Sequence, residues 1–153
     1  MIGIVFYYEQ VVAEIAPIYD QLLDRVCYNG KHFGATHILL IDGSSNHVLD
    51  KWKKGYGDSE VEIELFDSLN EIEKKYKDIP FVYLENKNTF ERMDLNYVDI
   101  KDFNPPENII YVSGQNYDNV NWIKDKKGYF VNISINDMFS DTACLIALYE
   151  RNR

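Results

Sequence analysis

Three short polar segments that follow apolar runs are the residues best suited to bind a small molecule. They span residues 84–86, 113–116 and 133–136. Each preceding run has the length of a buried strand, and in an open parallel sheet ligands bind beyond the carboxyl ends of the strands. Backbone N–H and C=O groups are free there, and Gly114 would let a ligand approach the main chain closely. These segments are candidate binding loops, while a plain turn remains the commoner role of each.

The rest of the sequence carries no sharper chemical motif. It contains no GxGxxG sequence and no P-loop sequence, so it predicts neither kind of nucleotide site. His32, His37 and His47 lack metal-ligand spacing, and His37, at the start of a strand, is expected to be structural. The carboxylate of Asp42 could meet a ribose hydroxyl or, more commonly, form a turn with Gly43. The sequence therefore predicts no metal site and identifies no catalytic residue.

Alternating strands and helices would position the three segments. Apolar strands are predicted at 3–8, 37–43, 80–84, 108–114 and 129–133, with a short strand at 61–65 that suits a sheet edge. Helices are predicted at 11–28, beginning near Pro17, at 68–76 and at 138–150. Ser68 and Glu71 form a capping box at the start of the second helix. This order predicts one α/β domain over residues 1–153, with three layers and a mainly parallel sheet.

The predicted C-terminal helix is apolar around most of its circumference. We therefore expect residues 138–150 to be covered on more than one side. Aromatic side chains are also frequent, and several are expected in or near loops. Stacking on bases or an adenine ring is one role for them, and packing in a core or a dimer interface is the commoner one. These loop aromatics are Tyr28, Tyr56, Tyr117 and Trp122.

Composition indicates an ordinary globular protein with an acidic surface. The chain has 153 residues, 46% of them hydrophobic, and a formal net charge of −9, which disfavours a broad nucleic-acid-binding face. Two local basic stretches, at 51–54 and 124–127, could form small RNA-binding patches or could be ordinary solvated loops. Cys27 and Cys144 are expected to be buried free thiols. We predict a cytoplasmic location and no membrane contact, because no apolar run would span a bilayer and no signal peptide is apparent.

In the order of these pieces, the chain resembles the SPOUT, or α/β-knot, RNA methyltransferases in their small single-domain form. The resemblance covers most of the chain in layout. It rests on residues 32–41, which are similar to the family's phenylalanine–glycine and second strand, on the glycine loop at 108–116, on the strand end at 131–135 and on the final helix at 143–150.

The resemblance implies a C-terminal trefoil knot whose three loops hold S-adenosylmethionine. It also implies a homodimer and an RNA substrate, either tRNA or rRNA, which a local basic patch would contact. The cofactor-binding residues it implies are Leu84, Glu85, Ser113, Gly114, Gln115, Asn116, Ile133, Ile135 and Met138.

Several positions depart from the family pattern. Asn116 replaces its glutamate, Ser134 replaces its proline, and residues 137–139 lack its asparagine. Tyr28 stands at the position of the family's catalytic arginine, and Arg25 lies roughly one turn earlier. Three interpretations therefore stay open: an RNA methyltransferase, a knotted fold that has lost catalysis and acts in binding, and an unrelated nucleotide-binding α/β domain.

Overall fold

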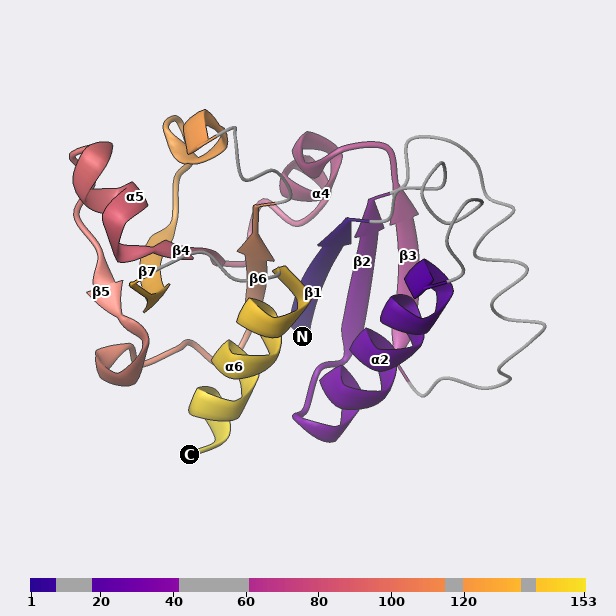
Figure 1. The fold of residues 1–153 in the computed structure, drawn as a ribbon. Coiled ribbons are helices and arrows are strands. Elements are labelled where there is room, and N and C mark those ends of the chain that lie inside the picture. The colour runs from indigo at the N-terminus through magenta and orange to yellow at the C-terminus, as the bar shows by residue number, and fades with distance from the viewer. Residues whose placement is uncertain (8–17, 42–60, 115–119, 136–139) are drawn as a thin grey trace.

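A seven-stranded sheet forms the centre of the computed structural model, which describes residues 1–7, 18–41, 61–114, 120–135 and 140–153 (Figure 1). The strand order is β3-β2-β1-β6-β4-β7-β5, and every neighbouring pair is parallel. The strands are β1 (Ile2–Tyr7), β2 (His37–Ile41), β3 (Glu62–Phe66), β4 (Phe81–Asn86), β5 (Val98–Asp99), β6 (Ile109–Ser113) and β7 (Tyr129–Ser134). The predicted α/β fold with a parallel sheet is confirmed.

Helices cover both faces of this sheet. They are α2 (Ile18–His32), α4 (Leu69–Lys75), α5 (Lys87–Arg92) and α6 (Ser140–Asn152), with short 3-10 helices η1 (Ile100–Asp102) and η2 (Val120–Ile123). One apolar cluster joins α2 and α6 to the sheet, and a second joins α4, α5 and η2 to its other face. The strands between these clusters are apolar because both of their faces are buried. The predicted knot involves 115–119 and 136–139, which lie outside the described residues.

Most predicted elements match the observed ones closely. Strand β3 lies at the edge of the sheet, as expected for its alternating sequence. The Ser68 side chain caps α4 by accepting a hydrogen bond from the Glu71 backbone N–H. Helix α5 and strand β5 were missed because 85–103 was read as mixed structure, although Asn86 caps α5 by accepting from the Thr89 N–H at 2.8 Å.

Helix α6 buries one face against the sheet and α2, whereas Tyr149 on it is 53% exposed. Ala143, Cys144, Ala147 and Leu148 are all nearly inaccessible to solvent in the cluster that α6 shares with α2 and the sheet. The expected free, buried thiols are confirmed, and burial raises the pKa of Cys27 to about 12. Within the ranges listed above, no helix has the length and apolar character needed to cross a bilayer.

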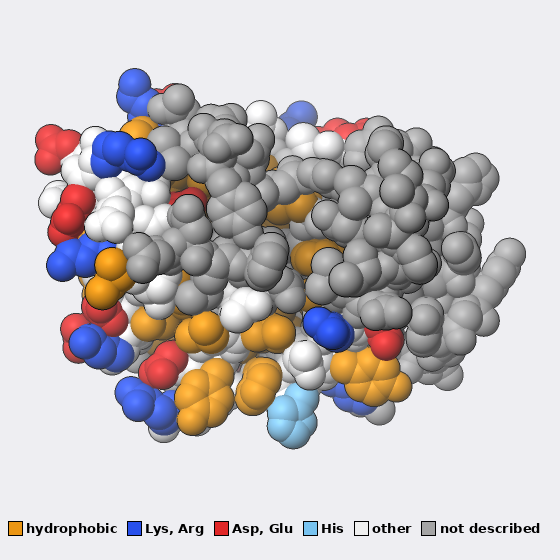
Figure 2. Space-filling view, viewed as in Figure 1, with side chains coloured by type: hydrophobic (Ala, Val, Ile, Leu, Met, Phe, Trp, Pro, Cys, Tyr) orange, Lys and Arg blue, Asp and Glu red, His pale blue; other side chains and the backbone are white. Residues whose placement is uncertain are grey.

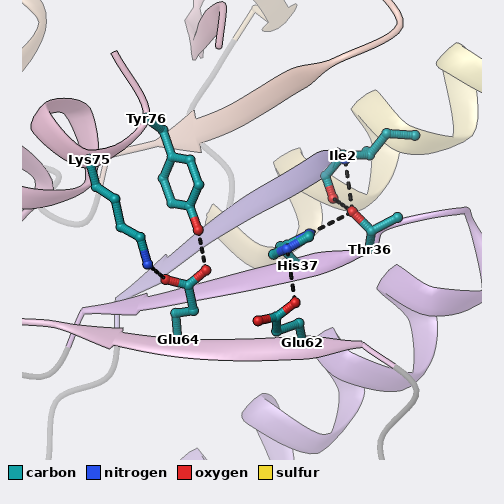
Figure 3. A network of polar contacts seen from close by, with 7 residues as sticks. All are labelled: Ile2, Thr36, His37, Glu62, Glu64, Lys75 and Tyr76. Carbon is teal, nitrogen blue, oxygen red and sulfur yellow. Dashed lines mark hydrogen bonds and ion pairs between the residues drawn. The ribbon is translucent and has the colours of Figure 1, made fainter. Parts of the chain in front are cut away.

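Glu64 links the edge strand β3 to helix α4 (Figure 3). Its carboxylate accepts hydrogen bonds from the Lys75 ammonium and the Tyr76 hydroxyl, and its side chain is only 17% exposed. Burial works to raise the pKa of Glu64. The hydrogen bonds from Lys75 and Tyr76, with the Lys75 charge, outweigh that effect and hold the pKa below its ordinary value of 4.5. Ionised Glu64 therefore stabilises the fold.

We predict that Glu64→Gln lowers the free energy of unfolding at pH 7 by about 1 kcal/mol. Because the pKa is lower in the folded chain than in the unfolded chain, this contribution is present above pH 4.5 and is lost as the pH falls through the folded pKa. Urea unfolding should show the variant and wild type converging in acid. Glu107→Gln, an exposed glutamate before β6, is the control. An equal deficit at pH 3 and pH 7 would contradict the assignment.

Candidate functional site

The three predicted binding segments end three neighbouring strands. Strand β4 lies between β6 and β7, and Leu84 is in register with Ser113 on one side and with Val131 on the other. One step further, Glu85 pairs with Asn132, and after a shift in register Asn86 pairs with Ser134. Because all three strands are parallel, their carboxyl ends meet at one edge of the sheet. We call the ends of β6, β4 and β7 the strand-end site.

Buried polar side chains gather at the strand-end site. In the described part of the chain, four polar residues are nearly inaccessible to solvent. Asn86, Ser113 and Asn132 lie at or near these strand ends, and Thr89 lies in α5, which directly follows β4. Asn132 accepts a hydrogen bond from the Ser134 N–H at 3.1 Å and donates one to Asp99 at 3.2 Å. Burying a polar group costs free energy unless the group is hydrogen-bonded. The carboxyl edge of the sheet therefore holds hydrogen-bonded polar side chains, whereas the strands leading to it are apolar.

Glu85 anchors a second set of contacts at the strand-end site. Its carboxylate accepts from the Trp122 indole N–H at 3.3 Å, and from the backbone N–H and side-chain amide of Asn86 at 2.9 and 3.1 Å. The indole lies directly against Gly114, since a Cβ built on Gly114 would be 2.5 Å from Trp122 Nε1. The close approach that Gly114 allows is therefore used by Trp122.

The remaining predicted residues occupy different environments. Leu84 is fully buried in the core, so only its main chain is at the site. Ile133 is partly buried, whereas Ile135 is 65% exposed just beyond β7. Gln115, Asn116 and Met138 lie outside the described residues.

The candidate segment 84–86 already contained Asn86, and Trp122 was expected to be a loop aromatic, but sequence reasoning missed Thr89 and Asn132 at this edge. The preference of asparagine for helix N-caps could have identified the contact between Asn86 and Thr89, which follows it three residues later. Asn132 carries no such signal, since it is recognisable only once β7 is paired with β4 and β5.

A hollow of about 410 Å³ lies at the opposite end of β4. Residues from the start of β4 and β7 line it, including Phe81 and Gly128, together with Glu73, Lys77 and Lys127. Its volume is in the range of ligand pockets. However, it is at the amino ends of the strands, where open α/β sheets rarely bind ligands, and its charges are mixed. We therefore place the candidate site at the carboxyl ends.

Aromatic side chains are exposed on the face formed by α2 and α6. Tyr28 of α2 is 70% exposed and Tyr149 of α6 is 53% exposed. Phe33 packs edge-on against Tyr149, with ring centroids 6.0 Å apart. The space-filling view shows apolar side chains gathered along the lower part of this face (Figure 2). Exposed apolar area of this kind commonly marks an interface.

Several solved protein structures have a fold similar to that of this chain. Neither a protein-family model nor a curated protein sequence matches the chain. A solved Bacillus anthracis structure, provisionally described as an RNA methyltransferase, is 20% identical, with a TM-score of 0.62 over 99% of this chain and 92% of that one. A Haemophilus influenzae protein described as a methylase family member is 16% identical over 98% of this chain, with a TM-score of 0.63.

An AdoMet-bound rRNA methyltransferase from Sinorhizobium meliloti is also similar. It is 12% identical over 99% of this chain, with a TM-score of 0.61. This chain spans 62% of the Haemophilus protein and 55% of the Sinorhizobium protein. At these identities, the likeness establishes a fold shared with RNA methyltransferases.

The contact between Gly114 and Trp122 gives a direct test of the strand-end geometry. We predict that Gly114→Ala displaces the indole, because the added methyl group would overlap Trp122 Nε1. We expect a loss of about 1–3 kcal/mol in unfolding free energy and altered Trp122 fluorescence. The measurement uses a Trp52→Phe background, which leaves Trp122 as the single tryptophan. Unchanged fluorescence and stability would show that the two residues are not in contact.

Proposed function

We propose that this chain is a SPOUT-type protein that binds S-adenosylmethionine at the strand-end site and transfers its methyl group to RNA. The observation that carries the proposal is the meeting of three polar segments at the adjacent ends of β6, β4 and β7. The fold shared with RNA methyltransferases supports it, and one of those structures is described as AdoMet-bound. The proposal includes the C-terminal knot, a single domain and a cytoplasmic location.

The residues of the strand-end site fit the chemistry of this cofactor. S-adenosylmethionine combines an adenine ring, ribose hydroxyls and two cationic groups, and it supplies an electrophilic methyl group when bound. Backbone groups at Ser113, Gly114 and 133–135 would hydrogen-bond the polar parts. The carboxylate of Glu85 favours a nearby cation, and Ile133 and Ile135 offer apolar surface. Transfer would depend on holding the methyl group in line with the accepting atom.

The proposed RNA substrate, tRNA or rRNA, requires a local basic surface on an acidic protein. The basic stretch at 51–54 lies outside the described residues. In the second stretch, Lys126 is ion-paired with Glu73 at 2.5 Å, whereas Lys124 and Lys127 are exposed. RNA binding through so few lysines would be weak and strongly dependent on salt.

We also propose that the chain is a homodimer. The exposed aromatic face of α2 and α6, which carries Tyr28 and Tyr149, is the surface that a second copy would cover. Tyrosine is enriched at protein interfaces because its ring is apolar and its hydroxyl can still reach water.

The second candidate function is binding without catalysis. The chain would then keep the fold and the binding site but transfer no methyl group. Two features favour it: the exposed Tyr28 stands at the position where the family's arginine is expected, and the net charge is −9. Cofactor binding without methyl transfer to any RNA would support this candidate over the first.

Ligand binding is tested by thermal unfolding with S-adenosylhomocysteine. A ligand that binds only the folded chain adds about 2.7 kcal/mol when present at 100 times its dissociation constant. We expect a raised melting temperature for the wild type and a smaller rise for Gly114→Ala. Lys77→Ala, at the hollow on the opposite end of β4, should respond as the wild type does. No shift at millimolar ligand would overturn the proposal.

The homodimer is tested by light scattering during gel filtration. We expect the wild type to have twice the mass of the chain at micromolar concentration, and Tyr149→Asp to be monomeric, because a buried unpaired charge is costly. Val98→Asp is the matched control, since Val98 is 45% exposed on β5, away from the proposed interface. A monomeric wild type, or equal effects of the two variants, would contradict the dimer.

A further inference from the structure

A second group of side chains with metal-binding chemistry lies on β2 and β3, away from the strand-end site (Figure 3). His37, Glu62 and Glu64 each offer one ligand atom, and these atoms lie within 4.8 Å of one another. Two of the residues are carboxylates and the third is an imidazole, a combination that binds zinc and related divalent ions.

Sheet geometry brings the three ligands together. His37 on β2 is the direct cross-strand partner of Glu62 on β3. Glu62 and Glu64 are two residues apart on one strand, so their side chains project from the same face. Two of these ligand atoms, His37 Nε2 and a Glu62 carboxylate oxygen, are 3.2 Å apart. This matches the separation of two ligands that share one zinc ion with bonds of about 2.0–2.2 Å.

A hydrogen bond at Nδ1, the ring nitrogen that does not face Glu62, holds the imidazole of His37 in position. Its Nδ1 lies 2.7 Å from the Thr36 hydroxyl oxygen. That hydroxyl is fixed in turn by the backbone of Ile2 on β1, since it accepts from the Ile2 N–H at 2.9 Å and lies 3.2 Å from the Ile2 carbonyl oxygen. The ring therefore presents Nε2 toward β3, as Figure 3 shows. Metal-binding histidines characteristically have their second nitrogen fixed in this way.

The same contacts suit the histidine tautomer that a metal requires. With the proton on Nδ1, His37 donates to the Thr36 hydroxyl, and that hydroxyl donates its own hydrogen to the Ile2 carbonyl. Nδ1, the Thr36 hydroxyl and the Ile2 backbone are then satisfied, and the Nε2 lone pair faces the Glu62 carboxylate. Two electron-rich groups at 3.2 Å repel one another unless a proton on Nε2 or a metal cation lies between them. A divalent ion would supply that charge.

Lys75 supplies a competing positive charge at Glu64. Its ammonium forms an ion pair with the Glu64 carboxylate, but the Lys75 side chain is 53% exposed. It also lies over the rings of Phe66 and Tyr76, 5.6 and 5.2 Å from their centroids. These rings can retain the ammonium when Glu64 turns toward His37. Removing Lys75 should therefore strengthen metal binding.

We propose that His37 Nε2, Glu62 and Glu64 form a binding site for a divalent transition-metal ion, with zinc as the preferred ion. Water would complete the coordination, because Glu62 is 68% exposed and the site opens to solvent. The ion would join edge strand β3 to β2 and, through Thr36 and Ile2, to β1. This site is independent of the proposed function at the strand-end site.

Isothermal titration calorimetry of the chelator-treated full chain with zinc chloride tests the site. We expect one high-affinity zinc ion per chain, at least about tenfold weaker binding for His37→Ala and Glu64→Gln, and tighter binding for Lys75→Gln. Magnesium chloride should bind far more weakly, because magnesium prefers oxygen ligands. His32→Ala, an exposed histidine on α2, is the matched control and should bind zinc as the wild type does.

A measurement on the wild-type chain avoids variants that fail to fold. Zinc should shift the imidazole nitrogen resonances of His37 and leave those of His32 unchanged. Absence of zinc binding, zinc binding unaffected by His37→Ala, or weaker binding for Lys75→Gln would each overturn the proposal.

Discussion

The parallel pairing of β4 with β6 on one side and β7 on the other is the constraint on which the candidate site depends. It aligns Leu84 with Ser113 and Val131, so three segments far apart in the chain end side by side. Each strand has an apolar body and a polar end. Strands β4 and β6 are buried along nearly their whole length, whereas β7 is exposed at Tyr129 and buried at its centre. The hydrophobic effect fixes the bodies, and the register then determines where the polar ends meet.

Two polar side chains at this edge of the sheet are buried and hydrogen-bonded, so their positions are fixed. Asn86 and Asn132 are nearly inaccessible to solvent. The Asn86 side chain accepts from the Thr89 N–H in the first turn of α5, and the Asn132 side chain accepts from the Ser134 N–H at the end of β7. Glu85 holds Trp122 against Gly114, which covers the carboxyl end of β6. The described strand ends therefore form a buried, hydrogen-bonded base suited to hold a cofactor. The cluster on β2 and β3 is separated from this base by β1, so the two sites can act independently.

Sequence patterns predict what is local and miss what depends on pairing. The buried strands follow from their apolar runs, the cap of α4 from Ser68 and Glu71, and the edge position of β3 from its alternation. Strand order is invisible in the sequence, so the adjacency of the three segments needed the structure. The same limit hid the group on β2 and β3, because His37 and Glu62 meet only across paired strands, and spacing along the chain predicted no metal site. Trp122 was read as a loop aromatic, since nothing local indicates that it lies on Gly114.

Whether the ends of β6, β4 and β7 bind an S-adenosyl cofactor can be measured residue by residue. The ¹⁵N-labelled chain is titrated with S-adenosylhomocysteine, and the backbone amide NMR shifts are followed. We expect the largest shifts on 84–86, 113–114 and 132–135 and on the Trp122 indole N–H, while the amides of 77–79, 81 and 127–128 stay unchanged. Shifts confined to that second group, which borders the hollow at the amino end of β4, would contradict cofactor binding at the strand ends.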